Sequence, residues 1–473
     1  MTDDRTARVS RPRFVPRRSR NLLVGVLVLA VVSRVGFVLA TPGYAPHLDD
    51  RDYFGLAHAI ARSGVYPTSK VWVGDRSCPA LTGLPATPCL AAPKAPGARL
   101  VDRPTAYRPP GYPYALAVPE LVASVTGVDG LWTARIFQAL LGVLDVILVG
   151  MLARRLWGDR VGLVALGLAV IDVPLMLVSG TLISEPLFVA LELGAVLAAL
   201  GARDRPGGAR RVVAAGALAA AAALTRTNGL LLVPAIALLA AAEAGRPRRT
   251  FLAVAAVALA GLAPWTVRNA VVLGHLVPVS TETGGTLVGT YNATSRADRN
   301  DPATWLAISQ IPQYALLTRQ QTAHTEFAVD KLLRGDALRF ARDHPSYPVA
   351  VLAQNLRRLL DLAGPQRIRF AAQTIDVPPT AAVWGAWVFY VLAVLALVGA
   401  LVPTLAAAPR TLWLLGLALL VGTVLVTSET PRFRAPLEPF VLLLAALGLL
   451  RLADAARGAV DRSPAGSPAG VEP

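Results

Sequence analysis

Charged residues are scarce in this chain: Asp, Glu, Lys and Arg make up only 16% of its 473 residues, whereas 54% are hydrophobic. The mean hydropathy of +0.52 is too high for a soluble protein of this length. This composition excludes a soluble globular protein and indicates one that is embedded in a lipid bilayer.

The chain also lacks the patterns that mark several common kinds of site. Its two cysteines and five histidines do not occur at the spacing of a metal site, and no Gly-rich phosphate-binding loop or internal repeat is evident. The net charge of +16 does not indicate a nucleic-acid partner, because the basic residues punctuate apolar segments instead of forming a basic surface. We therefore expect no bound nucleic acid and no nucleotide-binding domain.

The chain does contain a series of long apolar stretches. A helix needs roughly 17–25 predominantly apolar residues to cross the hydrocarbon of a bilayer. The sequence predicts an all-α integral membrane protein with about ten transmembrane helices, the first of them uncleaved because no clear small-residue cleavage site follows it. The predicted spans are 22–40, 132–152, 161–178, 186–200, 212–224, 230–242, 251–267, 381–401, 411–426 and 437–450.

The distribution of Lys and Arg predicts the orientation of these spans. If the N-terminus is cytoplasmic, the tails and connections on that side carry 21 basic residues. The short turns on the other side carry only Arg226, Arg432 and Arg434. Because basic residues are retained on the cytoplasmic side, both termini are expected there, in a multi-pass protein of the cell membrane.

This topology divides the chain into three parts. Residues 1–21 form a basic cytoplasmic tail, 22–453 a polytopic transmembrane domain, and 454–473 a disordered cytoplasmic tail. Two long connections, about 41–131 and 269–380, lie outside. The first contains both cysteines, Cys78 and Cys89, which in an oxidising compartment either form a disulfide or remain two free thiols.

Two short helices are predicted in the first external connection. After the first span, Tyr53, Ala57 and Ile60 recur at helical spacing behind an acidic cluster, which predicts an interfacial amphipathic helix with its apolar face on the membrane. Segment 114–126 is only 13 residues long, so we expect an in-plane or re-entrant helix there, not a full span.

The strongest functional signal is a set of polar residues that the topology brings to the outer membrane face. Ionisable groups beside hydrocarbon are costly unless they are paired or functional, so the set indicates a site, although Glu185 and Arg226 individually could cap and pair helix ends. A carboxylate such as Asp49 can act as general base towards a hydroxyl, while arginines neutralise a lipid-linked phosphate. The candidate catalytic residues are Asp49 and Asp50, and the candidate residues for binding a donor phosphate or substrate are Arg108, Glu185, Arg226, Arg268, Asn269, Glu429, Arg432 and Arg434.

These residues lie in short motifs whose order along the chain resembles the GT-C superfamily of polyprenyl-phosphate-dependent glycosyltransferases. The similarity is to protein O-mannosyltransferase-like and lipid A aminoarabinose-transferase-like enzymes in particular. The motifs are Asp49-Asp50-x-x-Tyr53, Gly64-Val65-Tyr66-Pro67, Arg108-Pro109-Pro110-Gly111-Tyr112-Pro113, Ala134-Arg135, Ser184-Glu185-Pro186-Leu187-Phe188, Leu224-Thr225-Arg226-Thr227-Asn228-Gly229, Pro264-Trp265-Thr266-Val267-Arg268-Asn269 and Pro431-Arg432-Phe433-Arg434-Ala435-Pro436.

The resemblance implies an inverting transfer of a sugar from a prenyl-phosphate carrier, with a catalytic acidic residue in the first external connection. That residue corresponds to Asp49 or Asp50; the usual Asp-Glu pair is Asp-Asp here, and we favour Asp49 as the base. The implied partners are a polyprenyl-phosphate-linked sugar donor, membrane lipids, and a protein, lipid or glycan acceptor. No cofactor is assigned, but some members of the superfamily use a divalent metal, which Asp49, Asp50 and His47 could bind.

Two other functions would use a similar set of residues. A transporter or flippase for a lipid-linked saccharide can also gather arginines and acids at one face. Transporters, however, place their site near the membrane midplane, commonly in paired repeats, and neither feature is evident. A non-catalytic scaffold would leave the acidic and arginine residues unexplained. The sequence therefore favours a glycosyltransferase with an extracytoplasmic active site.

Overall fold

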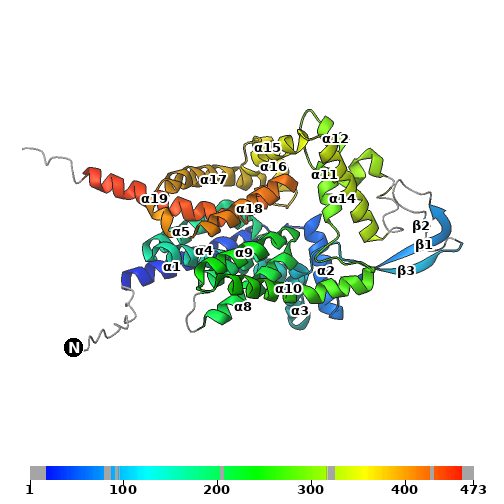
Figure 1. Cartoon of the computed structure of the whole chain (residues 1–473), viewed down its shortest axis with the longest axis horizontal. Helices are drawn as coiled ribbons and strands as arrows, with labels where there is room; N and C mark the ends of the chain where they lie inside the picture. The colour runs from blue at the N-terminus through cyan, green and yellow to red at the C-terminus, as the bar shows by residue number, and fades with distance from the viewer. Residues whose placement is uncertain are drawn as a thin grey trace, which may run out of the picture.

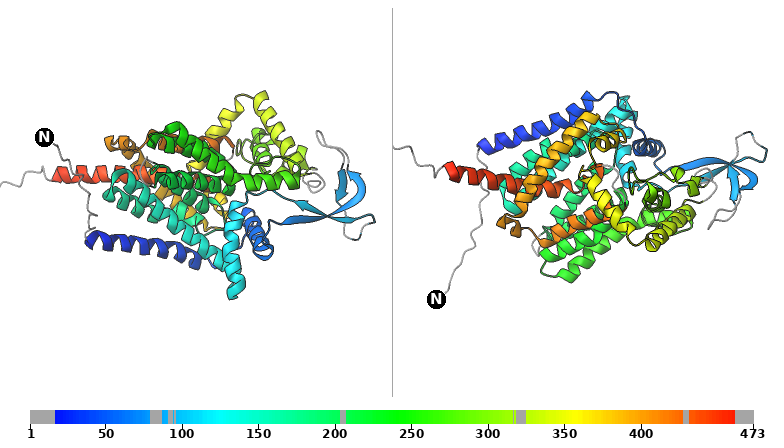
Figure 2. Two further views of the ribbon diagram at one scale, coloured as in Figure 1. Left: turned by 60° about the horizontal axis from the view of Figure 1, so that its bottom comes forward. Right: turned by 90° about the horizontal axis from the view of Figure 1, so that it is seen from above.

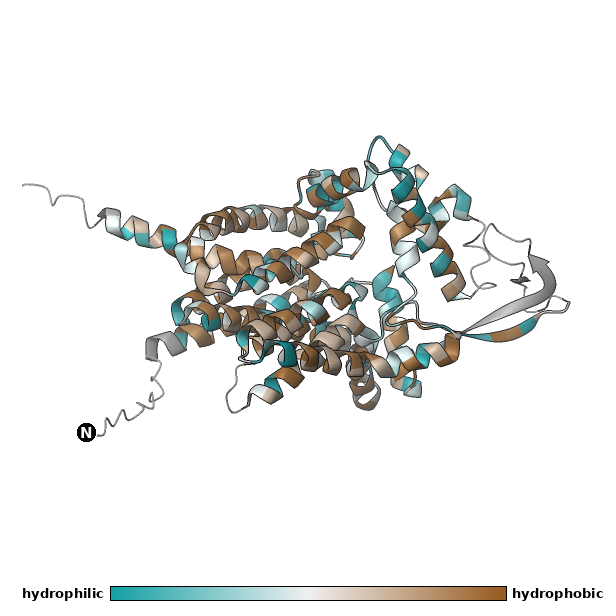
Figure 3. Cartoon of the chain, in the orientation of Figure 1, coloured by the Kyte–Doolittle hydropathy of each residue, from teal (hydrophilic) through white to brown (hydrophobic). Residues whose placement is uncertain are grey.

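The computed structural model describes residues 17–78, 87–90, 94, 96–202, 207–315, 317, 325–426 and 431–460. Long helices form a bundle, and helix α1 (Arg17–Ala40) begins at one end of it (Figure 1). An outer lobe of shorter helices and three projecting strands lie at the opposite end, as two further views show (Figure 2). Hydrophobic residues predominate on the bundle helices, and hydrophilic residues are more frequent in the outer lobe (Figure 3). The bundle is thus the membrane-embedded part.

Among the residues that the structure describes, six helices are long and apolar enough to cross a membrane. Two predicted spans are shorter apolar helices, and two more are α7 and the pair α5 and α6. The all-α multi-pass membrane fold is therefore confirmed, whereas a count of ten full spans is not. The six long helices are α1 (Arg17–Ala40), α4 (Gly130–Trp157), α8 (Gly208–Thr225), α10 (Pro247–Leu273), α17 (Pro379–Ala400) and α19 (Glu438–Val460). The others are α5 (Asp159–Ile171), α6 (Val173–Val178), α7 (Glu185–Ala199), η1 (Thr227–Leu231), α9 (Leu232–Glu243), η4 (Pro403–Ala407) and α18 (Arg410–Val426).

The predicted span 161–178 is interrupted between α5 and α6. Arg34 of α1 donates to the carbonyls of Ala169 and Val170, both at 2.6 Å. These carbonyls belong to the last turn of α5, where no backbone amide of the helix is available to donate a hydrogen bond to them. Asp172 then accepts a hydrogen bond from the Leu175 amide at 2.9 Å and caps α6. The buried arginine and the cap stabilise a break that hydropathy alone does not reveal.

The first long connection, about 41–131, contains more structure than the sequence predicted. Three antiparallel strands form a small sheet in the order β2-β1-β3, where the Pro- and Gly-rich sequence indicates only a loop. The side chains of Cys78 and Cys89 lie outside the described residues, so the possible disulfide stays a prediction. The strands are β1 (Thr68–Cys78), β2 (Thr87–Leu90) and β3 (Arg99–Pro104).

The amphipathic helix predicted after the first span is α2 (Asp49–Ser63), but its apolar face packs on protein. Tyr53 and Ala57 are buried in one cluster with Tyr112 of α3 (Gly111–Thr126). The Tyr53 and Tyr112 rings meet edge to face with their centroids 5.0 Å apart. The expectation that this face lies on the membrane is therefore wrong, because α3 covers it.

The second long connection, about 269–380, folds into the outer lobe. Its helices surround a separate core that includes Val288, Leu333 and Val351. The elements are α11 (Thr283–Thr290), α12 (Ala293–Ala297), η2 (Ile308–Gln310), η3 (Pro312–Tyr314), α14 (Glu326–Asp343), α15 (Tyr347–Leu359) and α16 (Pro365–Gln373). Because this lobe has its own core, it can hold the start of α11 against the outer end of the bundle.

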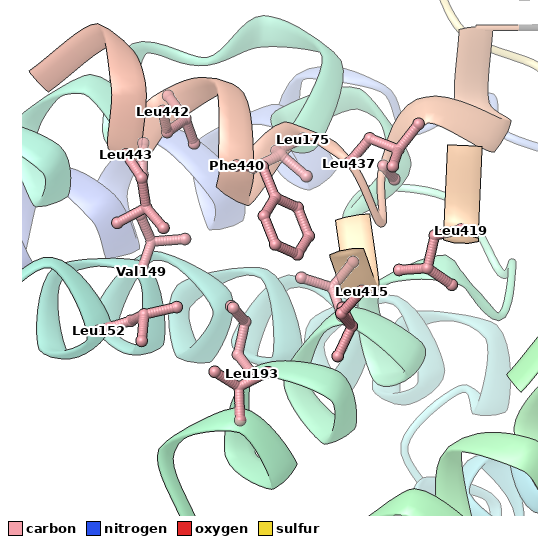
Figure 4. Packing of buried hydrophobic residues seen from close by; sticks show 14 of the residues in the cluster. Val149, Leu152, Leu175, Leu193, Leu415, Leu419, Leu437, Phe440, Leu442 and Leu443 are labelled. Atoms are coloured by element: carbon pink, nitrogen blue, oxygen red, sulfur yellow. The ribbon is translucent and has the colours of Figure 1, made fainter. Parts of the chain in front are cut away.

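The first half of α19, the last helix that the structure describes, lies within the core of the bundle. Phe440 belongs to the same buried cluster as Val149 of α4 (Figure 4). The helix also approaches α17 closely, because Gly399 and Gly448 leave no side chain between the two backbones. The short helix η5 (Pro431–Arg434), which precedes α19, is therefore held at the outer end of the bundle.

Candidate active site

Six side chains that lie far apart in the sequence meet at the outer end of the bundle, and their ion pairs form one continuous network. Each comes from the beginning or end of an element, where the chain leaves the bundle. They are Asp49 at the start of α2, Arg108 before α3, Glu185 at the start of α7, Arg226 between α8 and η1, Glu282 before α11, and Arg432 in η5.

Asp49 is central to this network, because each of its carboxylate oxygens faces a different arginine. Oδ1 accepts a hydrogen bond from Arg108 Nη2 at 2.6 Å, and Oδ2 accepts one from Arg432 Nη2 at 2.5 Å. Burial raises the pKa of Asp49, but Arg432 and Arg108 outweigh burial and hold that pKa well below its usual range. Asp49 is therefore ionised at neutral pH.

On the side of the network towards the outer lobe, Arg108 contacts three acidic residues. Besides its bond to Asp49, its Nη2 donates to Asp52 Oδ2 at 2.9 Å, and its Nη1 lies 3.6 Å from Glu282 Oε2. The other oxygen of Glu282, Oε1, accepts a hydrogen bond from the Thr227 hydroxyl at 3.0 Å. Burial raises the pKa of Glu282, and Arg108 offsets only part of that rise.

On the opposite side of the network, Arg226 and Arg432 flank a buried carboxylate. Glu185 Oε1 lies 2.7 Å from Arg226 Nη1 and 3.7 Å from Arg432 Nε. Both guanidinium groups lie over the ring of Phe433. Within the part of the chain that the structure describes, the buried Nε groups of Arg226 and Arg432 have no hydrogen-bond partner. Two donors are thus left that an anion would satisfy.

Asp50, the neighbouring carboxylate, has a different partner. It is buried and accepts a hydrogen bond from the Tyr44 hydroxyl at 2.5 Å, and that hydroxyl accepts one from the Leu182 amide at 2.9 Å. Burial raises the pKa of Asp50 to about 7, although the Tyr44 hydrogen bond and Arg432 oppose the rise. Asp50 thus connects α2 to the turn before α7, while Asp49 is the carboxylate that both arginines contact.

Two residues predicted for the donor site, Arg268 and Asn269, lie apart from the network and hold backbone instead. Arg268 Nη1 donates to the carbonyl of Thr105 at 2.7 Å, and Asn269 Nδ2 donates to that of Val277 at 2.9 Å. Both interactions attach neighbouring loops to the end of α10. Each side chain therefore has a structural partner in the backbone, and a role in donor binding stays a prediction.

Arg434, also predicted for the donor site, belongs to a second, buried cluster. Its Nε donates to Glu438 at 2.5 Å, and its Nη1 lies 2.9 Å from Asp361 Oδ2. All three side chains are buried, so this cluster joins η5, α19 and the end of α15. Glu429, the remaining candidate, lies outside the described residues.

A small, largely apolar hollow, with about 50 Å³ of space for water-sized molecules, opens beside the network. Its apolar lining comes mainly from α6, α17, α16 and the segment after α16, and its charged lining residues are Asp361, Arg432 and Arg434. Arg432 therefore belongs both to the network and to the lining of the hollow. The apolar lining includes Leu177, Val178, Ile368, Ile375, Val377 and Ala386.

The proposed metal ligands do not converge on one point. Asp49 faces Arg108 and Arg432, whereas Asp50 faces Tyr44, and His47 Nε2 lies 2.8 Å from the Gln373 carbonyl. No group of three or more His, Cys, Asp or Glu side chains arranged for a metal ion occurs among the described residues. These side chains do not fit a divalent cation in this arrangement, so no chemistry is assigned to one.

Glu282 was not among the residues predicted from the sequence. It lies in a polar external connection, in the stretch Ser280-Thr281-Glu282-Thr283-Gly284, without a motif and without an apolar pattern around it. Only the folding of the outer lobe onto the bundle brings its carboxylate within reach of Arg108. A polar residue in a long loop carries no sequence signal for such a position.

Comparisons with known proteins agree with this architecture. Residues 107–267 match the sequence model of the dolichyl-phosphate-mannose-protein mannosyltransferase family, and this range includes Arg108, Glu185 and Arg226. No curated protein matches the chain significantly. The family match covers about a third of the chain and leaves out Asp49 and Arg432.

Solved membrane glycosyltransferase structures resemble the whole chain at low identity. The oligosaccharyltransferase of Archaeoglobus fulgidus, tethered to an acceptor peptide, is 15% identical with a TM-score of 0.50, covering 96% of this chain and 51% of that one. ArnT of Cupriavidus metallidurans, bound to undecaprenyl phosphate, is 19% identical with a TM-score of 0.38, covering 95% and 81%. The chain therefore spans about half the length of the archaeal enzyme and shares its fold.

The chain is a multi-pass membrane protein with the helical architecture of the GT-C glycosyltransferases. Its resemblance to that superfamily, first indicated by the motifs, is confirmed by the mannosyltransferase family match, and the archaeal structure supports the shared fold.

Proposed function

We propose that this protein is a membrane glycosyltransferase that moves a sugar from a polyprenyl-phosphate carrier to an acceptor hydroxyl on the extracytoplasmic face. The observation that carries the proposal is the position of Arg432, which contacts Asp49 on one side and lines the apolar hollow on the other. A cation in the lining of an apolar hollow suits an amphiphile with an anionic head. The solved relatives named above include one bound to undecaprenyl phosphate.

In the proposed complex, the prenyl chain occupies the apolar hollow and the phosphate meets Arg432 and Arg226. The free Nε donors of these two arginines account for part of its binding. A phosphate also competes with Asp49 for Arg432, because both are anions that need the same donor. Donor binding would thereby weaken the hold of the arginines on Asp49 and raise its basicity.

The proposed reaction uses the carboxylate of Asp49 and the guanidinium groups of the arginines. The acceptor hydroxyl oxygen forms a bond to the anomeric carbon, and Asp49 takes the hydroxyl proton as general base. The bond between the anomeric carbon and the phosphate oxygen breaks, and the arginines stabilise the negative charge that remains on the prenyl phosphate. Attack from the face opposite the phosphate inverts the anomeric configuration.

The sidedness of the site rests on the distribution of basic residues, with 21 on the proposed cytoplasmic side. Both termini are then cytoplasmic, and the outer lobe and the network are extracytoplasmic. A carrier lipid and a water-borne acceptor would meet at this surface.

Labelling of single cysteines tests this orientation. In a variant whose native cysteines are replaced by serine, Asn300→Cys is expected to react with an impermeant maleimide in intact cells, whereas Arg210→Cys should react only after permeabilisation. Both positions are exposed, so access depends on the membrane side. The reverse labelling pattern would invert the topology and remove the extracytoplasmic site.

Replacing Arg226 with lysine is expected to raise the KM for the donor about 10–100-fold, because lysine keeps the charge but loses the planar fork and its Nε donor. The measurement is initial-rate kinetics with purified protein over a range of donor concentrations. Arg268→Lys is the matched control, since Arg268 holds the Thr105 carbonyl, and its donor KM should stay near the wild-type value. An unchanged donor KM in Arg226→Ala would exclude a phosphate contact.

The function itself is tested by supplying purified protein with a panel of radiolabelled prenyl-phosphate sugars. Three neutral acceptors are offered: a serine-containing peptide, octyl glucoside and diacylglycerol. Labelled product in any of them supports the proposal. Movement of labelled carrier across proteoliposomes, with no glycosylated product, would instead support a flippase.

A further inference from the structure

We infer that Glu282 binds the acceptor and that the acceptor presents a neutral hydroxyl-bearing group to it. This inference rests on the proposed function and assigns the acceptor side of the same site. Glu282 lies across Arg108 from Asp49, and neither the motifs nor the family match includes it.

The geometry leaves one oxygen of Glu282 available for a ligand. Oε1 accepts a hydrogen bond from the Thr227 hydroxyl at 3.0 Å, and that hydroxyl also lies 2.9 Å from the Ser280 hydroxyl, which fixes the carboxylate. Oε2 lies 3.6 Å from Arg108 Nη1, too far for a hydrogen bond. Within the described part of the chain, Oε2 has no closer polar partner, and the side chain is 20% exposed. A held carboxylate with an open oxygen can accept a hydrogen bond from a hydroxyl.

The exposure of the network distinguishes an acceptor side from a donor side. Asp52 and Glu282, on the side of Arg108, are 44% and 20% exposed, whereas Glu185, between Arg226 and Arg432, is 1% exposed. Water-borne molecules therefore reach the network from the acidic side. The hollow that suits a prenyl chain lies beside Arg432, and so on the opposite side.

The balance of charge favours a neutral acceptor. Asp49, Asp52, Glu185 and Glu282 are set against three arginines, Arg108, Arg226 and Arg432. A donor phosphate adds further negative charge. An acceptor with an anionic group next to its hydroxyl would meet Asp52 and Glu282 at short range and be repelled.

Kinetics with the acceptor as the varied substrate test this assignment. Glu282→Ala is expected to raise the acceptor KM about 10–100-fold, the range for loss of a hydrogen bond to a charged group. Glu282→Gln keeps an accepting oxygen and should restore most of the loss. The donor KM should remain within about twofold of wild type in both variants, since the donor side is not altered. Glu326→Gln is the matched control, because the Glu326 oxygen already accepts hydrogen bonds from the Ala106 amide and the Thr281 hydroxyl.

The charge assignment is tested with paired acceptors. Each neutral acceptor of the panel is compared with an anionic counterpart: a peptide flanked by aspartates, octyl glucuronide or phosphatidylglycerol. The neutral member should give the higher kcat/KM. Equal use of both members, or an acceptor KM unchanged in Glu282→Ala, overturns this inference while wild-type transfer still supports the proposed function. Absence of transfer by the wild-type protein with every donor and acceptor refutes the proposed function itself.

Discussion

Replacing Asp49 with asparagine is expected to lower the turnover number about 10²–10⁴-fold, the usual contribution of a general base. Asparagine has nearly the same shape but cannot take the proton from the acceptor hydroxyl. The donor KM should not rise, because Arg108 and Arg432 lose a competing anion and remain available to the phosphate. The measurement is kcat and KM for the donor at saturating acceptor.

Two neighbouring carboxylates serve as controls for this result. Asp52→Asn also removes a partner of Arg108, but its side chain is the more exposed one, and its turnover should stay close to wild type. Asp50→Asn keeps an oxygen that can accept the Tyr44 hydrogen bond but places an amide NH2 group at a buried position, so we expect it to lower stability more than turnover. Near wild-type transfer by Asp49→Asn, Asp50→Asn and the double variant would place the catalytic centre elsewhere and favour the flippase.

Replacing Arg434 with alanine is expected to destabilise the protein by about 3–5 kcal/mol, the usual cost of removing one partner of a buried ion pair. The substitution leaves the buried carboxylates of Glu438 and Asp361 without their cation. The Arg432→Ala variant, changed two residues earlier, should instead keep most of the wild-type stability but bind the donor poorly, with a raised donor KM. Thermal unfolding of the detergent-solubilised protein, measured beside the donor KM, separates the two effects.

One result would contradict the structural role that we assign to Arg434. If Arg434→Ala unfolds at the wild-type temperature but no longer uses the donor, Arg434 binds the phosphate, as the motif 431–436 predicted. The guanidinium of Arg434 lies over the ring of Phe389, and in Arg434→Met only the apolar part of the side chain is kept. Its unfolding temperature should therefore lie between those of wild type and Arg434→Ala.

Several features of the site follow from the sequence by local reasoning. An aspartate pair directly after the first span, and arginines in short turns between apolar stretches, are recognisable because hydropathy and chain direction place them at one membrane face. Asp49, Arg108, Glu185, Arg226 and Arg432 indeed lie in one network. Which residues of this face point at each other does not follow from that reasoning.

The sequence by itself determined the membrane class, the all-α architecture and the face on which ionisable side chains gather, because each depends on the local match between a segment and its solvent. Tertiary packing alone decided that Arg432 faces Asp49 while Arg434 is buried with Glu438, since the turn of η5 directs two nearby side chains to different neighbours. It likewise decided that Glu282 reaches Arg108, because this contact depends on how the outer lobe, which has its own core, packs against the bundle. Contacts between elements far apart in the chain depend on how those elements pack. Local composition and periodicity do not predict that packing.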